Sequence, residues 1–376
     1  MTKKSDAPAI RFKGFSDAWE QRKVSELFRV TRGYVLAATQ TETTKTDEKP
    51  YPVYSSQTKD KGLMGYYKDY LYEDAITWTT DGANAGTVNY RAGKFYCTNV
   101  CGVLLSNEVK ANQMIAEALN SVAKGYVSYV GNPKLMNNVM ADIVIQIPTQ
   151  AEEREQLSSF FAKLDNLITL HQRKFEKLTN VKKSMLEKMF PQNGSSYPEI
   201  RFKGFTDPWE QRKLGDIASD MVAGGDIDKD LILAEGQYPV IANALTGDGI
   251  VGYYDKEYRV NAPAVTVTGR GDVGHAKARL VNFTPVVRLL SVKSEHDVFF
   301  LENAINTLKI VIESTGVPQL TVPQLAKYEV AFPRQLDEEE HIGAFFKQLD
   351  NLITLHQREL EKLQNIKKSM LEKMFV

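Results

Sequence analysis

The feature that most constrains this chain is an internal duplication. Residues 164–190 return at 349–375 with 23 of 27 positions identical, and the first ten of them, LDNLITLHQR, are repeated letter for letter. Residues 10–23 return at 200–213 with 12 of 14 positions identical. Because self-similarity on this scale marks a repeated structural unit, the chain is expected to fold as two like units.

The middle of each repeat is far less alike. Residues 51–67 match 238–254 only in a frame, with Tyr-Pro-Val at the start, Gly-Tyr-Tyr at the end and little in common between them. Short runs such as DAITWTT and APAVTVT, bounded by Gly, Asn and Asp, indicate strands. The fold class predicted is therefore α/β, with two pseudo-symmetric domains and two long helices. The predicted boundaries are 1–151 and 200–336 for the domains, 152–190 and 337–376 for the helices, and 191–199 for a Pro-, Gly- and Ser-containing linker.

Each predicted helix carries a stripe of apolar residues and one histidine, with a mean spacing of about 3.57 residues, between a coiled-coil seam and a straight helix. A helix of about 58 Å is too long for a small domain to bury alone, so the two copies are expected to pack antiparallel. The first stripe is Leu164, Ile168, His171, Phe175, Leu178, Val181, Met185 and Met189, and the second is Leu349, Ile353, His356, Leu360, Leu363, Ile366, Met370 and Met374.

Composition restricts where and how the chain works. No apolar run approaches the roughly 18 residues of a membrane span, and the first residues do not read as a signal peptide, so the cytoplasm is expected. Cys97 and Cys101 are interpreted as buried thiols. Lys and Arg number 47, as do Asp and Glu, so any contact with nucleic acid must rest on local patches or on partners.

Several motifs resemble cofactor- or metal-binding sites but are better explained by turns or packing. GRGDVG at 269–274 lacks the following helix of a dinucleotide site, and DIDKD at 226–230 has Leu231 where a calcium loop needs glycine. His171 and His356 have no recurring acidic or Cys partner on their stripe, so we interpret them as interface histidines. No metal site and no catalytic residue is predicted in this chain.

The order of the blocks carries a family resemblance. KGFTDPWEQRKLGDI, then YPV…GYY, then LDNLI…HQR…L…KKSML, given twice, resembles the DNA specificity subunit of type I restriction-modification systems over essentially the whole chain. The resemblance implies two target recognition domains that each read half of an asymmetric, bipartite DNA sequence. It also implies that the paired helices form an antiparallel coiled coil that sets the spacer, about 17 base pairs of B-form DNA for 58 Å, and docks two modification methyltransferase subunits.

The same resemblance implies a non-catalytic chain without a cofactor of its own. S-adenosylmethionine and ATP would be bound by the methyltransferase subunits, which flip and methylate an adenine, and by restriction or translocase subunits. Side chains suited to base edges or phosphates are expected in the loops of each domain. The candidates are Ser55, Ser56, Gln57, Thr58, Lys59, Tyr67, Thr79, Thr80 and Asn84 in the first domain, and Asn243, Thr246, Tyr254, Thr268, Arg270, Asp272 and His275 in the second.

Two other classes of protein compete with this interpretation. A self-contained DNA methyltransferase would need a glycine loop opening a helix and a motif that holds a flipped base, and neither is found. A coiled-coil scaffold with two peptide- or sugar-binding modules fits the composition equally well. Salt-sensitive, sequence-dependent DNA binding distinguishes the specificity subunit from the scaffold.

Overall fold

A computed structural model describes residues 8–57, 59–228, 230–244, 246–311 and 318–375. The chain forms two compact units, one of residues 1–171 and 359–376 and the other of residues 172–358. These units divide both long helices, α4 (Ala151–Met189) and α8 (Leu336–Met374), which the predicted boundaries kept as separate segments. Each helix has 39 residues, and none in the described part of the chain is long and apolar enough to cross a membrane.

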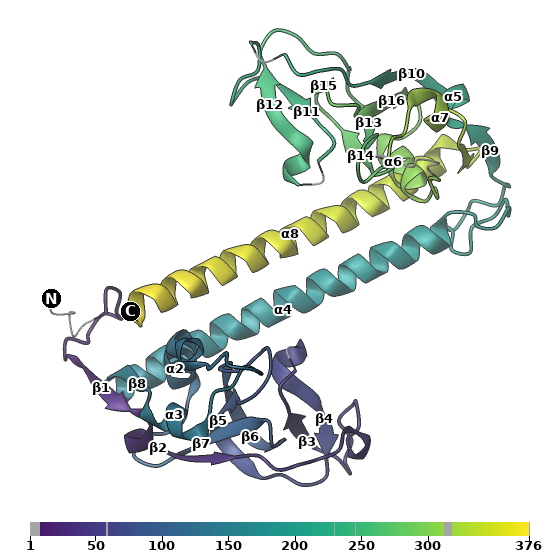
Figure 1. The fold of residues 1–376 in the computed structure, drawn as a ribbon. Coiled ribbons are helices and arrows are strands. Elements are labelled where there is room, and N and C mark those ends of the chain that lie inside the picture. Colours follow the sequence, from purple (N-terminus) through teal and green to yellow (C-terminus); the bar gives the residue numbers. More distant parts are fainter. Residues whose placement is uncertain (1–7, 58, 229, 245, 312–317, 376) are drawn as a thin grey trace. The chain divides into compact units, whose positions relative to one another are not determined.

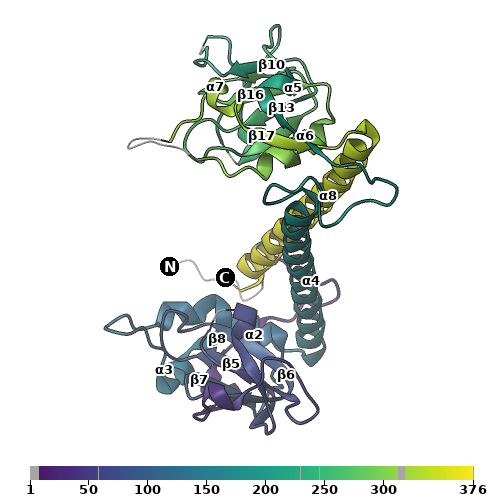
Figure 2. The ribbon, with the colours of Figure 1, turned by 90° about the vertical axis from the view of Figure 1, so that its right-hand side faces the viewer.

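Unit 1 is built on a six-stranded sheet in the order β2-β7-β5-β6-β3-β4, in which only β3 and β6 pair in parallel. Helix α2 packs on β6, and a separate antiparallel pair, β1 and β8, leads into α4 (Figures 1 and 2). The strands are β1 (Trp19–Lys23), β2 (Phe28–Arg32), β3 (Tyr51–Tyr54), β4 (Leu63–Tyr67), β5 (Tyr72–Thr79), β6 (Val88–Cys97), β7 (Cys101–Ser106) and β8 (Val144–Pro148). The short helices are α1 (Val24–Leu27), α2 (Gln113–Ala123) and α3 (Asn137–Asp142), with 3-10 turns η1 (Ala38–Gln40), η2 (Lys59–Gly62) and η3 (Lys124–Tyr126).

Unit 2 repeats the plan with a more divided sheet. Its strands form the groups β10-β16-β13-β14, β12-β11-β15 and β17-β9, and α6 packs on β14 and β13 (Figure 1). The strands are β9 (Glu210–Lys213), β10 (Ala218–Ala223), β11 (Tyr238–Ile241), β12 (Ile250–Tyr254), β13 (Ala264–Val267), β14 (Ala276–Arg279), β15 (Thr284–Pro285), β16 (Leu290–Ser294) and β17 (Glu329–Phe332). The helices are α5 (Leu214–Ile217), α6 (Val298–Asn306) and α7 (Val322–Leu325), with turn η4 (Gly247–Gly249).

The repeated block near the start of each unit holds the first turn of a long helix. In unit 1 the Arg11 guanidinium donates from Nε and Nη2 to the two carboxylate oxygens of Glu153, at 2.7 Å each, and Trp19 Nε1 donates to the same carboxylate. We call this arrangement of arginine, tryptophan and glutamate the clasp. Unit 2 repeats it with Arg201, Trp209 and Glu338, and the arginine–glutamate distances are again 2.7 Å. Both copies of the block therefore make the same contacts with a long helix, which accounts for their near-identity.

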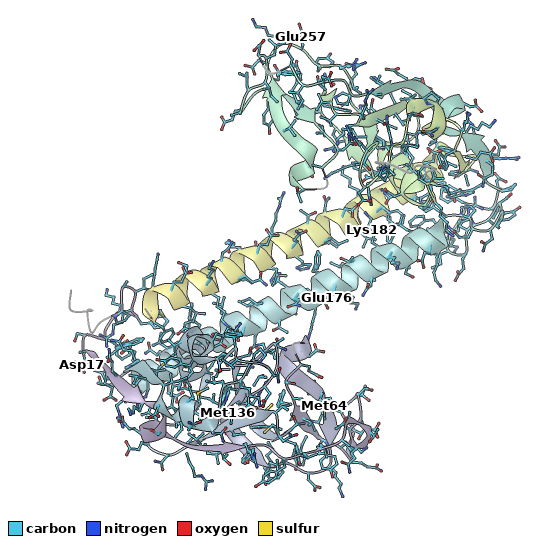
Figure 3. All side chains as sticks on the ribbon, in the orientation of Figure 1. Asp17, Met64, Met136, Glu176, Lys182 and Glu257 are labelled. Carbon is cyan, nitrogen blue, oxygen red and sulfur yellow. The ribbon has the colours of Figure 1, made fainter. Side chains whose placement is uncertain are left out.

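The two long helices pack antiparallel inside each unit, as predicted. In unit 1, Phe161 of α4 lies 6.1 Å from the Phe375 ring after α8, while Asp165 pairs with Lys367 four residues further along α4. In unit 2, Lys182 of α4, labelled in Figure 3, pairs with Asp350, and Phe190 lies 6.0 Å from Phe346. Each unit's core therefore includes an end of the other repeat's helix, with Met374 in unit 1 and Met189 in unit 2.

The stripes are buried mainly at their ends. Leu164, Met189, Leu349 and Met374 are buried, whereas the residues between them are half-buried and Ile366 is 36% exposed. The other helix was expected to cover each stripe. Two helices alone cover only the facing side of each, and domain residues complete the burial only near the helix ends.

A lysine of one repeat also contacts carboxylates of the other. Lys367 Nζ lies 2.6 Å from both Asp165 Oδ1 and Glu117 Oε1, the latter on α2. In unit 2, Lys182 pairs with Asp350 at 2.6 Å, and Glu302 of α6 takes the place of Glu117. Burial raises the pKa of Glu302 to about 7, with Lys182 opposing the shift and Asp350 adding to it.

Glu302→Gln is expected to stabilise the protein at pH 8 by about 2 to 3 kcal/mol and to have little effect at pH 5. The pKa of Glu302 is higher in the folded state than in the unfolded state, so the wild type is most stable at a pH where Glu302 is protonated. The wild type loses this stability as the pH rises through about 7. Urea unfolding at both pH values measures the difference, with exposed Glu340→Gln as the control. An equal effect of Glu302→Gln at both pH values would contradict the assignment.

Candidate DNA interface

In the middle segment of each repeat, 51–67 and 238–254, the residues that the repeats share form a β-hairpin. The residues that differ form the loop of this hairpin. Tyr51 pairs with Tyr67 across β3 and β4, and Tyr238 pairs with Tyr254 across β11 and β12. The Ser55 N–H donates to the Gly62 carbonyl at 2.8 Å, and Ala242 and Gly249 make the same bond. The loops thus closed, 55–62 and 242–249, are called the recognition loops.

A glycine is required where each recognition loop closes. Gly62 has φ +90° and Gly249 has φ +73°, in the left-handed region that L side chains rarely adopt. A Cβ on Gly62 would lie 2.7 Å from the Ser55 carbonyl oxygen, and one on Gly249 would lie 2.7 Å from that of Ala242. The two units therefore close loops of different sequence in the same way.

An asparagine joins each recognition loop to a neighbouring turn. In unit 1, Asn84, in the turn between β5 and β6, donates from Nδ2 to the Ser56 carbonyl at 2.9 Å. In unit 2 the asparagine lies in the recognition loop itself, where Asn243 Oδ1 accepts from the Gly269 N–H at 2.7 Å. The two segments that hold most of the predicted readers thus lie together in each unit.

Unit 1 presents its candidates unevenly. Ser55 is half-buried and its Oγ accepts from Thr98 Oγ1 at 2.9 Å, whereas Gln57 is exposed and its amide donates to the Leu63 carbonyl. Tyr67 is half-buried against the Tyr96 ring. Thr58 and the side chain of Lys59 lie outside the described residues.

Four predicted readers lie inside the fold instead of on its surface. Thr79 and Thr80 are each 7% exposed, Thr268 is 6% exposed and Tyr254 is 9% exposed. Thr80 Oγ1 donates to Asp81, Thr268 Oγ1 donates to the Asp272 carbonyl, and the Tyr254 hydroxyl accepts from the Asp228 N–H. Three of the four side chains therefore already take part in hydrogen bonds inside their unit, and a contact of any of the four with DNA stays a prediction.

Unit 2 has more of its predicted readers in solvent. Thr246, Arg270, Asp272 and His275 are exposed, and the last three lie in the turn between β13 and β14. His275 Nε2 is 3.1 Å from Asp272 Oδ2. Arginine, aspartate and histidine together offer donors and acceptors for base edges.

The long helices present apolar residues that the stripe did not include. Leu167 and Leu170 on α4 are 45% and 46% exposed, and the equivalent Leu352 and Leu355 on α8 are 43% and 51% exposed. The sequence did hold a signal, because both pairs lie within the repeated decamer. Of the predicted interface residues, Ile168, His171, Phe175, Leu178, Met185, Ile353, His356, Leu360, Leu363 and Met370 are half-buried.

No group of three or more His, Cys, Asp or Glu side chains suited to a metal ion occurs in the described ranges. Cys97 and Cys101 are both buried and unpaired with each other. Burial raises the pKa of both thiols, to about 11 for Cys101, so neither has the accessible thiolate of a reactive cysteine.

Comparison with known proteins places the fold in a family. The family model described as the type I restriction modification DNA specificity domain matches twice, at residues 16–180 and 206–365. Two Mycoplasma pneumoniae proteins, both named as candidate type I specificity subunits, are 30% identical over 86% of this chain and 86% of their own, and 27% identical over 77% and 89%.

A solved structure has the same fold. The S subunit of a type I restriction-modification system from M. genitalium matches with a TM-score of 0.77 and 14% identity, over 98% of this chain and 99% of that one. With a family match in each repeat, this chain belongs to the type I restriction modification DNA specificity family.

Proposed function

We propose that this chain is the sequence-reading subunit of a type I restriction-modification complex. Each unit would read one half of a bipartite, asymmetric DNA target with its recognition loop and the neighbouring turn. The observation that supports this most is the distribution of difference between the repeats. Clasp, hairpin strands and helices are repeated, whereas the loops they hold differ, as two readers of different half-sites require.

The paired helices would set the spacing of the half-sites and dock two methyltransferase subunits. Those partners would supply S-adenosylmethionine chemistry on a flipped adenine, and restriction or translocase subunits would use ATP. With no net charge of its own, the chain would rely on its partners for much of the phosphate contact. The chain itself would carry no reaction step.

Exchange of residues 1–150 for the equivalent segment of another family member is expected to change one half-site only. The test is methylome sequencing of cells that express the chain with its modification subunit, with and without the exchange. The wild type should give adenine methylation at one split, asymmetric motif. A change in both half-sites would contradict independent reading, and no new methylation with an active partner would favour the peptide- or sugar-binding scaffold.

The exposed leucines provide a test of docking. L167S/L170S and L352S/L355S are each expected to weaken binding of the methyltransferase subunit at least tenfold, because each double change removes about 1 to 2 kcal/mol or more of apolar burial. Titration of purified chain with the partner measures the affinity. The control is N166S/Q172S, two exposed polar positions on the same helix. Equal affinities of all three variants would exclude this surface as the dock.

A further inference from the structure

An arginine occupies the same place on a strand pair in each unit, buried in unit 1 and half-buried in unit 2. Arg91 of β6 is 6% exposed, and its Nε donates to Thr77 Oγ1 of β5 at 3.0 Å. Arg279 at the end of β14 donates from Nε to Thr266 Oγ1 of β13, also at 3.0 Å. The arginine and threonine thus occupy equivalent places on equivalent strand pairs.

Arg91 contacts both ends of its recognition loop. Its Nη2 donates to the Lys61 carbonyl at 2.7 Å, in turn η2, where the loop returns to β4. Its guanidinium carbon lies 3.7 Å from the centre of the Tyr54 ring, and Tyr54 is the residue before the loop begins. The planar guanidinium can make these contacts simultaneously because its donors form a rigid fork.

Arg279 occupies the corresponding place in unit 2. Burial lowers the pKa of both Arg91 and Arg279, and for Arg279 the nearby Asp248 opposes this effect. Asp248 lies in η4, the turn that closes the second recognition loop. Asp248 itself forms an ion pair with Lys277, and Arg279 adds a second positive charge near it.

Burial of the Arg91 guanidinium is unfavourable by itself. Among the described residues no carboxylate forms an ion pair with Arg91, and a buried cation without one is unfavourable unless hydrogen bonds hold it. The strands around the two arginines have diverged almost completely. Of the ten positions in 88–97 aligned with 276–285, only Arg91/Arg279 and Phe95/Phe283 are identical.

We propose that Arg91, through its contacts with Lys61 and Tyr54, and Arg279, through its equivalent position, are positioning residues that fix the two recognition loops and thereby set how strictly each half-site is discriminated. This inference rests on the proposed function. Neither guanidinium needs to touch DNA. A loop held at both ends presents its base-reading side chains at a fixed distance, which base discrimination by hydrogen bonds requires.

The test uses Arg91→Lys and Arg279→Lys in the full chain with its methyltransferase partner. Lysine keeps the charge but cannot make the forked contacts. The ratio of methylation rates on the cognate site and on sites with one changed base is measured for each half separately. Arg91→Lys should reduce discrimination about tenfold in the half read by unit 1 and leave the other half unchanged, and Arg279→Lys should do the reverse.

Each variant is the matched control of the other. A merely structural role would lower methylation on all sites in parallel without changing the preferred base, and that outcome would overturn the inference. If Arg91→Lys does not fold, Thr77→Val, which removes the Nε acceptor, takes its place, with Thr77→Ser as the variant that keeps it. Unchanged discrimination in Thr77→Val would be equally decisive against it.

A second readout needs no DNA. Hydrogen exchange of the Ser55 amide, whose N–H donates to the Gly62 carbonyl, should accelerate at least tenfold in the free chain of Arg91→Lys. If exchange is faster in Arg91→Lys but the wild type directs no methylation, the proposed function is wrong, whereas the conclusion that Arg91 holds the loop stands. A sequence-specific wild type with unchanged discrimination in Arg91→Lys would overturn only the positioning role.

Discussion

Arg11→Ala is expected to lower the free energy of unfolding by about 3 to 5 kcal/mol. The carboxylate of Glu153 is fully buried, and both its oxygens accept from Arg11 at 2.7 Å. Removal of the guanidinium leaves a buried charge with only the longer Trp19 hydrogen bond. The positive end of the α4 dipole offsets a small part of that cost.

Urea unfolding of purified variants measures this effect. Arg201→Ala should have a similar effect, because Glu338 is 1% exposed and is held in the same way. The control is Arg334→Ala, which breaks a 2.9 Å ion pair with Glu210 that is more than half exposed on both sides. That change should cost less than about 1 kcal/mol. Equal losses of unfolding free energy in Arg11→Ala and Arg334→Ala would show that the clasp stabilises the fold no more than an exposed ion pair does.

The duplication and the long helices could be predicted because they depend on local pattern. Helix α4 begins at Ala151 and ends at Met189, one residue from the predicted 152–190, and α8 begins one residue before the predicted 337. The clasp could not be predicted in the same way. Arg11 and Glu153 lie 142 residues apart, so no local sequence pattern predicts their contact. The near-identity of the two blocks indicated only that both copies have the same structural role.

The sequence predicted which residues lie in the loops, but it could not predict which of their side chains are buried. A threonine after a strand signals a hydrogen bond, but sequence does not say whether its partner is inside the fold or on a ligand. Thr80 and Thr268 are satisfied by Asp81 and by the Asp272 carbonyl, and both are buried. The burial of Arg91 could not be predicted either, because a lone arginine in a strand is more often exposed.

Phe190→Ala is expected to cost about 3 to 5 kcal/mol, the usual loss when a buried aromatic is truncated. Phe190 follows the last residue of α4, yet it lies in the core of unit 2, where most buried residues come from the second repeat. Its ring lies 5.9 Å from Trp209, 5.5 Å from Phe300 and 6.0 Å from Phe346. The change would leave a cavity among three aromatic rings.

The equivalent Phe375 gives the comparison. It is only half-buried and packs on Trp19 and Phe161 in unit 1, at 5.7 and 6.1 Å. Phe375→Ala should therefore cost clearly less than Phe190→Ala in urea unfolding followed by tryptophan fluorescence. If the Phe190→Ala loss were no larger than that of Phe375→Ala, the deeper burial of Phe190 would not set the cost of the change. Each ring comes from one repeat and packs on residues of the other, so a loss of several kcal/mol in either variant means that the two repeats fold as one interdependent chain.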